Sequence, residues 1–136
     1  MNSGPASTGL LDTSVVIDLN KLPPSVLPTT SLISAITLAE LLQGVHLANG
    51  PVQRAIRLER IRAVEASFPE PLSFDSAAAR EYATLVALVL GAGRNPKPRR
   101  LDLMIAATAA AIKVPIFTRN AKDLAGLHNR LKVISV

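Results

Sequence analysis

The chain contains no cysteine and few aromatic residues, and both shortages limit what it can do. Without cysteine in its 136 residues, it forms no disulfide and no thiolate metal site, and it fits a reducing compartment such as the cytoplasm. Aromatic residues make up only 3% of the chain, so we do not expect base stacking on aromatic side chains to dominate its binding. No apolar run reaches the roughly 18 residues that a membrane span needs. The first residues also lack the basic-then-apolar pattern of a secretory signal.

Hydrophobic residues, at 49% of the chain, are abundant enough for a buried core. A length of 136 residues predicts one domain. Residues 1–7 are small and polar, and we expect them to be a disordered lead-in to a single domain over residues 8–136.

Positive charge is concentrated in one segment. The net charge is +5, from 15 Lys and Arg against 10 Asp and Glu. Four of the basic residues fall close together with no acid among them: Arg94, Lys97, Arg99 and Arg100. A basic loop of this kind suits a phosphate-bearing partner, although a solvated loop that only aids solubility has the same composition.

Strand-like and helical segments alternate along the chain. The expected strands cover residues 8–12, 31–34, 70–75, 115–118 and 131–136. The expected helices cover residues 14–19, 37–46, 52–66, 76–90 and 101–113, with a helical turn at 120–124. This order predicts an α/β fold of three layers, α/β/α, with helices on both faces of a mostly parallel central sheet of about five strands.

Four acidic residues fall at corresponding places in this predicted fold. Asp12 ends the first strand, and Glu40 lies in the first turn of the helix after the second strand. Asp102 lies in the first turn of an apolar helix, and Asp123 follows the fourth strand. All four places face the same edge of a parallel sheet, where the carboxylates would repel one another. A hard divalent cation such as Mg²⁺ resolves that repulsion, and it can activate water and stabilise charge on a phosphate.

Each acid also has a purely structural interpretation. Asp12 can cap the helix that follows it, and Glu40 can complete a capping box that begins at Thr37. Asp102 can complement its helix dipole, and Asp123 can form a turn. However, the helix of Asp102 is otherwise apolar, so an unmatched carboxylate there costs stability. The four together therefore favour a shared site.

Four segments, in order along the chain, carry a resemblance to a known family. They are Leu11-Asp12-Thr13-Ser14, Ser34-Ala35-Ile36-Thr37-Leu38-Ala39-Glu40-Leu41, Leu101-Asp102-Leu103-Met104-Ile105-Ala106-Ala107-Thr108-Ala109 and Phe117-Thr118-Arg119-Asn120-Ala121-Lys122-Asp123-Leu124. Together they resemble the PIN domain, and specifically the VapC-type toxins of bacterial toxin–antitoxin pairs. The resemblance spans residues 8–136.

The resemblance implies a Mg²⁺- or Mn²⁺-dependent endoribonuclease that forms a homodimer and is neutralised by a small VapB-like antitoxin. It implies that three acids of this chain form the metal site: Asp12, Glu40 and Asp102. It also implies that nearby hydroxyls support the site, and these correspond to Thr13, Ser14 and Thr118. By the same resemblance, an antitoxin segment would lie against the helices between residues 37 and 66 and would place an arginine in the acidic cleft.

The fourth acidic position departs from the family pattern. In many relatives it falls two residues after the threonine, where this chain has Asn120. Either Asp123 serves instead or Asn120 acts through its amide oxygen, and we expect Asp123 to contribute. The predicted reaction is in-line hydrolysis of an RNA phosphodiester that leaves a 5′-phosphate and a 3′-hydroxyl. The basic loop 94–100 and Arg119 would guide the RNA backbone.

The main alternative is a catalytically silent metal- or protein-binding α/β module. Asp12-Thr13-Ser14 is similar to the D-x-S-x-S loop of metal-binding adhesion domains, but Val16 stands in place of the second serine. A phosphotransfer domain with Asp12 as phosphate acceptor is a further alternative. Against it, Ser14 stands where such phosphatases have a second acid.

Overall fold

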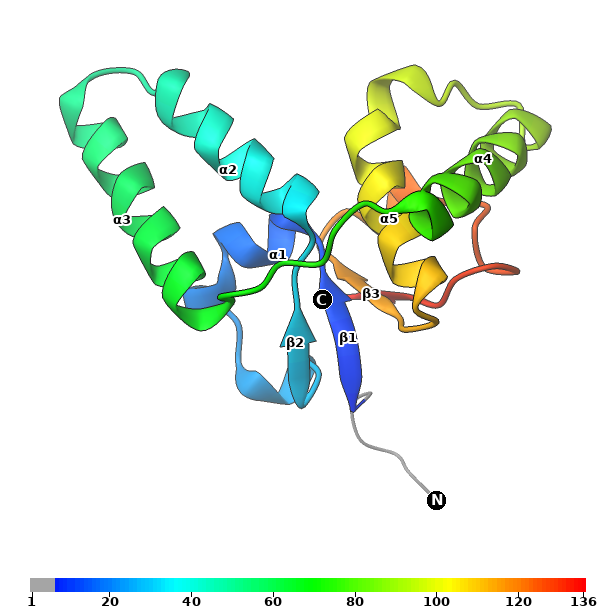
Figure 1. Cartoon of the computed structure of the whole chain (residues 1–136), viewed down its shortest axis with the longest axis horizontal. Helices are drawn as coiled ribbons and strands as arrows, with labels where there is room; N and C mark the ends of the chain where they lie inside the picture. Colours follow the sequence, from blue (N-terminus) through cyan, green and yellow to red (C-terminus); the bar gives the residue numbers. More distant parts are fainter. Residues whose placement is uncertain (1–6) are drawn as a thin grey trace.

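A parallel sheet of four strands lies at the centre of the molecule in the computed structural model, which describes residues 7–136 (Figure 1). The strands are β1 (Thr8–Leu11), β2 (Thr30–Leu32), β3 (Ile116–Thr118) and β4 (Val133–Ser135). Their order across the sheet is β2-β1-β3-β4, and all neighbours are parallel. Since helices cover both faces, the predicted α/β fold class is confirmed.

The sheet has four strands, whereas about five were expected from the alternation of segments. The segment 70–75 contributes only an isolated bridge between Leu72 and Ser34. Pro69 and Pro71 explain the difference, because proline has no backbone N–H to donate to a ladder. Leu72 alone pairs, donating to the carbonyl of Ile33 over 2.9 Å.

The predicted lead-in, residues 1–7, lies outside the described residues except for Ser7. The Ser7 carbonyl accepts a hydrogen bond of 2.7 Å from the amide of Thr30, at the start of β2. Ser7 therefore joins the backbone hydrogen bonding at the edge of the sheet.

Five α-helices and four short 3₁₀ turns connect the strands within residues 7–136. The helices are α1 (Thr13–Ile17), α2 (Ala35–His46), α3 (Pro51–Ser67), α4 (Ser76–Gly91) and α5 (Arg100–Ala111). The 3₁₀ turns are η1 (Leu19–Lys21), η2 (Pro24–Val26), η3 (Lys97–Arg99) and η4 (Ala121–Leu124). None of the helices in this part of the chain combines the length and apolar character required to cross a bilayer.

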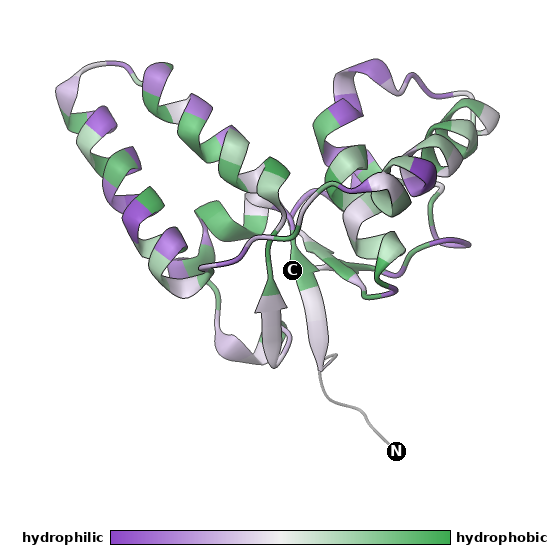
Figure 2. Ribbon diagram, viewed as in Figure 1, coloured by the Kyte–Doolittle hydropathy of each residue, from purple (hydrophilic) through white to green (hydrophobic). Residues whose placement is uncertain are grey.

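Two hydrophobic cores form because successive side chains of a strand point to opposite faces. Leu10 and Ile116 join a core with α4 and α5. Leu11 and Phe117 join a second core with α1, α2 and α3. Figure 1 shows the result as two helical arms, α2 with α3 and α4 with α5, on either side of the sheet. Hydrophilic residues concentrate on α3 and on the segment that leads into α5 (Figure 2).

Helix α5 is buried along most of its length, as its composition predicts. Five of its apolar residues are fully buried: Leu103, Ile105, Ala106, Ala107 and Ala109. Its first turn is the exception, and it carries Asp102 as its acidic residue. The packing of α5 against the sheet therefore determines where this carboxylate lies.

The start of α2 differs from expectation. The predicted capping box between Thr37 and Glu40 is wrong, because α2 begins at Ala35 with Ser34 as its cap. The Ser34 hydroxyl accepts from the Thr37 amide over 3.1 Å, which leaves Glu40 in the second turn with its side chain free to point elsewhere. On α3, Ile61 and Val64 are buried. Ile56, however, is 57% exposed and lines a pocket instead of the core.

Candidate active site

Asp12 follows β1 directly and is only 5% exposed. It caps α1, because its Oδ1 accepts from the Thr13 amide over 2.9 Å. Its Oδ2 accepts from the hydroxyls of Ser14 at 3.1 Å and Thr118 at 2.8 Å. The structural and functional interpretations of Asp12 are thus compatible, since its cap bond and its two hydroxyl bonds hold a buried carboxylate in one orientation.

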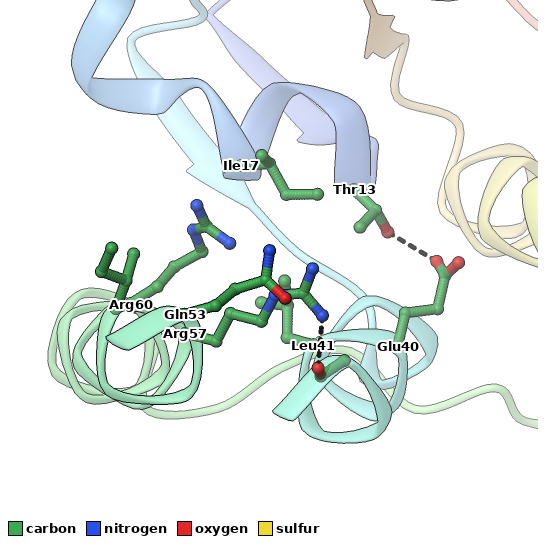
Figure 3. Close-up of a pocket in the computed structure, with 9 residues that line it drawn as sticks. Thr13, Ile17, Glu40, Leu41, Gln53, Arg57 and Arg60 are labelled. Carbon is green, nitrogen blue, oxygen red and sulfur yellow. Dashed lines mark hydrogen bonds between the residues drawn. The ribbon is translucent and has the colours of Figure 1, made fainter. Parts of the chain in front are cut away.

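Glu40 reaches the same region from α2, and its Oε1 accepts from the Thr13 hydroxyl over 2.7 Å (Figure 3). The Thr13 oxygen also lies 2.9 Å from the hydroxyl oxygen of the fully buried Thr37. Because Thr13 has one hydroxyl proton and gives it to Glu40, Thr37 donates in the second bond. Burial raises the pKa of Glu40, opposed by the Thr13 hydrogen bond and assisted by the negative charge of Asp12.

Asp102 carries the clearest electrostatic sign of a shared site. Its pKa is raised from 3.8 to about 6, mainly by burial and further by the negative charges of Asp12, Asp123 and Glu40. Arg99 opposes it. The pKa of Asp102 therefore depends on the other three acids that the sequence predicted, although these come from three separate segments.

Asp123 lies in η4 with its side chain 45% exposed, and its Oδ1 is 4.0 Å from Nε of Arg99. Asn120 is exposed, and its backbone amide donates to the Thr118 hydroxyl over 3.0 Å. Thr118 thus receives a bond from Asn120 and gives one to Asp12. Of the two candidates for the fourth position, Asp123 adds negative charge near Asp102, whereas Asn120 acts through its backbone.

Arg119, predicted to guide RNA, is held by side chains of α1 and its cap. Its Nη1 lies 2.8 Å from Oδ2 of Asp18, and its backbone amide donates to the Ser14 hydroxyl over 3.1 Å. Sequence reasoning missed Asp18 because its partner is 101 residues away. It also missed Thr37 as a site residue. The sequence did contain a signal for Thr37. It precedes Glu40 by three residues, and residues three apart on a helix lie on the same face.

The basic loop divides into residues that hold it together and residues that face solvent. Arg94 donates to the carbonyl of Lys122 over 2.9 Å, which ties the loop to η4. Arg99 donates to the carbonyl of Asn95 over 3.0 Å and faces Asp123. Lys97 and Arg100 are exposed. The charges of Lys97 and Arg100 are therefore the two in the loop that are open to solvent.

The acidic residues suit a hydrated divalent cation in donor type and charge. Within residues 7–136, no three acidic or imidazole side chains lie close enough to enclose an ion by themselves. Mg²⁺ commonly binds one or two carboxylates and keeps several waters, so it does not require a closed cage. The pKa values of Asp102 and Glu40 are raised mainly by burial and further by neighbouring carboxylates, and a bound cation would favour the charged form of both.

Comparison with known proteins gives consistent results. The family model of the PIN domain matches residues 10–125. The chain is 36% identical to Ribonuclease VapC5 of Mycobacterium tuberculosis, over 98% of this chain and 96% of that protein.

Solved structures agree with the sequence comparison. The structure of VapBC-5, a member of the VapBC family of toxin-antitoxin systems from Mycobacterium tuberculosis, matches with a TM-score of 0.84 and 36% identity, covering 96% of this chain and 99% of that chain. FitAcB from Neisseria gonorrhoeae matches with a TM-score of 0.71 and 26% identity, covering 93% of this chain and 96% of that chain.

Proposed function

The chain belongs to the PIN domain family and is of the VapC type, and from this premise we propose that it is a metal-dependent endoribonuclease, the toxin of a toxin–antitoxin pair. One observation carries the proposal. Burial together with carboxylates from three other segments raises the pKa of Asp102 to about 6 at the carboxyl edge of a parallel sheet. A group of carboxylates of this kind can bind a divalent cation, and the bound cation can in turn bind a phosphate group.

In this proposal four acids hold the cation, directly or through its waters: Asp12, Glu40, Asp102 and Asp123. The ion, Mg²⁺ or Mn²⁺, supplies activation of water and stabilisation of phosphate charge when bound. The hydroxyls of Ser14 and Thr118 orient Asp12, and the Thr13 hydroxyl orients Glu40. The carboxylates that would bind the cation are therefore in position before the substrate binds.

The proposed reaction is hydrolysis of an RNA phosphodiester. The oxygen of a water molecule attacks the phosphorus in line, and the bond from phosphorus to the 3′-oxygen breaks. The water loses its proton to a carboxylate or to solvent, and the 3′-oxygen gains one. The products are a 5′-phosphate and a 3′-hydroxyl. The exposed Lys97 and Arg100 support the RNA backbone beside the acids, in a protein that would act in the cytoplasm.

The proposed partners are a VapB-like antitoxin and a second copy of the chain. The support for the antitoxin is twofold: the similarity to VapBC-5, and the exposed aliphatic side chains of the α2–α3 arm, such as Leu42, Leu47 and Val52. An arginine of the antitoxin entering the acidic site would block it. For the homodimer, Leu90 and Ile112 on the other arm are exposed at 59% and 44% and offer an apolar contact. Light scattering of the purified chain, alone and with the antitoxin, tests both partners.

The test of function is cleavage of total RNA by protein freed of any co-purified partner, with Mg²⁺, with Mn²⁺ and with EDTA. Asp12→Asn and Asp102→Asn should abolish cleavage while remaining folded. Asp75→Asn is the matched control, because Asp75 caps α4, where Asn is an equally good cap. If the wild type and the two site variants behave alike, the acids are structural and the silent binding module is the better description.

A further inference from the structure

A pocket of about 520 Å³ opens beside the acidic site, between α1, α2 and α3. Thr13 and Glu40 line one end of it, and Gln53, Arg57 and Arg60 of α3 line the other. Figure 3 shows the side chains of α3 extending across this space toward α1 and α2. The pocket therefore connects a pair of guanidinium groups directly to the carboxylate of Glu40 and its hydroxyl partner.

Arg57 is held in position by α2. Its Nη1 donates to the carbonyl of Gly44, in the last turn of α2, where carbonyl groups lack a partner within the helix. A guanidinium has five N–H donors, so this bond uses only a small part of its capacity. The remaining donors are available to a ligand in the pocket.

The arginines of α3 divide into two sets. Arg57 and Arg60 are partly buried and line the pocket, whereas Arg54 and Arg62 are exposed. Arg62 pairs with Glu59 over 3.4 Å. The ion pairs found within residues 7–136 include neither Arg57 nor Arg60. Partly buried cations without a carboxylate partner favour an anionic ligand.

We propose that this pocket holds the RNA strand on one side of the scissile phosphate, with Arg57 and Arg60 binding a backbone phosphate. The inference rests on the proposed ribonuclease function and adds a binding site to it. The acids repel a phosphate chain, so cations on both sides of them are needed to hold the strand in place. Lys97 and Arg100 lie on the side of α5, and the two arginines of α3 lie on the other arm (Figure 1).

The rest of the pocket wall suits a nucleotide. Gln53 accepts from the Asn49 amide through Oε1, which leaves its side-chain N–H groups to donate to a base or a ribose hydroxyl. Leu41 and Ile56 provide apolar surface beside it. An acidic peptide could also bind two arginines. The pocket opens onto Glu40, so an RNA strand bound at the arginines continues directly to the acids, and an antitoxin segment that runs from the α2–α3 arm into the acids would compete with it for the pocket.

The experiment compares two double variants of α3 that lose the same charge. Arg57→Ala with Arg60→Ala removes the pocket pair, and Arg54→Ala with Arg62→Ala removes the exposed pair. Binding of a short, fluorescently labelled single-stranded RNA of mixed sequence is measured by anisotropy in EDTA over a series of salt concentrations. Arg60→Ala alone is included because Arg57 also ties α3 to α2, and thermal unfolding checks every variant.

Removing the pocket pair should weaken RNA binding about tenfold and lower the salt slope by about 0.7 for each phosphate that is no longer neutralised. The Arg60→Ala variant should show part of this effect, and removing the exposed pair should have little effect. Equal weakening in the two double variants, or no weakening in either, would overturn the inference. So would weaker binding of the purified antitoxin with unchanged RNA binding, which would make the pocket a protein-docking site.

Failure of the proposed function gives a different result. If the wild type cleaves no RNA with Mg²⁺ or Mn²⁺ but binds RNA through the pocket pair, the ribonuclease proposal fails and the binding site stands. If the wild type cleaves RNA and removal of the pocket pair changes neither KM nor binding, the ribonuclease proposal stands and the pocket inference fails.

Discussion

The hydroxyl of Thr13 donates a 2.7 Å hydrogen bond to the carboxylate of Glu40 and so joins the first turn of α1 to the second turn of α2. The buried hydroxyl of Thr37 lies 2.9 Å behind it and fixes the direction of the Thr13 proton. Glu40 is thus oriented by a chain of two hydroxyls, one of which is inaccessible to solvent. The next residue toward the sheet, Asp12, is the cap of the same helix that carries Thr13.

Thr37→Val should therefore reduce RNA cleavage about tenfold, because Thr13 loses the donor that fixes its proton. Thr37→Ser keeps the hydroxyl and loses a buried methyl group, which costs about 1 kcal/mol of unfolding free energy. Thr37→Ser should accordingly retain most of the activity in spite of lower stability. Initial cleavage rates and urea unfolding of both variants make the comparison, and a serine variant as inactive as the valine variant would contradict the role of the hydroxyl.

Asp102→Asn should stabilise the protein in EDTA at neutral pH. The pKa of Asp102 is about 6 in the folded chain against 3.8 for the free side chain, so the folded state binds this proton more tightly than the unfolded state. The unfolding free energy of the wild type therefore falls as pH rises through that interval, whereas that of the asparagine variant does not, because asparagine does not titrate. The difference in unfolding free energy between Asp102→Asn and the wild type should be absent near pH 3.8 and reach its full size above about pH 6.

Urea unfolding at acidic and neutral pH, in EDTA, measures this difference. Adding Mg²⁺ at neutral pH should reverse the order, since a bound cation stabilises the wild type and the variant has lost one of the carboxylates that would bind it. A difference between the two proteins that does not change with pH would show that Asp102 is not perturbed in the way described.

Lys97→Ala with Arg100→Ala should weaken RNA binding and lower its salt dependence, because these side chains are exposed at the edge of the site. Arg99→Ala should behave differently. Arg99 lies 4.0 Å from Asp123 and lowers the pKa of Asp102, so its removal should raise that pKa further. Salt-dependent binding measures the first effect, and NMR titration of the metal-free protein measures the second. An unchanged salt slope would remove the exposed pair from the binding surface.

Gly9→Ala should destabilise the fold. A Cβ at Gly9 would overlap a ring carbon of Phe117 and would lie 3.3 Å from the ring of Pro28. Phe117 is 1% exposed and directly precedes Thr118, so the ring cannot move without disturbing β3. We expect a loss of roughly 3 kcal/mol in unfolding free energy. Urea unfolding measures it, and adding Phe117→Leu should recover part of the loss; a fully stable Gly9→Ala would show that the ring has room to shift.

Much of the fold could be predicted because its signals are local. The apolar run before Asp12 predicts a strand, and the nearly continuous apolar character of α5 predicts its burial. The errors have equally specific causes. Two prolines reduced the expected strand over 70–75 to a single bridge at Leu72, and Ser34 capped α2 one turn before the expected start. That shift placed Glu40 in the second turn and made its contact with Thr13 possible.

By itself, the sequence determined the alternation of helices and strands and the two-sided burial of the sheet, and it predicted which four acids would form the site, because periodicity and residue type depend only on neighbours along the chain. Tertiary structure alone decided which hydroxyl orients which carboxylate, that Asp18 holds Arg119, and that two arginines of α3 face the acidic site while two others face solvent. Those relationships join residues far apart in sequence. They depend on the angles at which the helices pack on the sheet, and no local pattern records those angles.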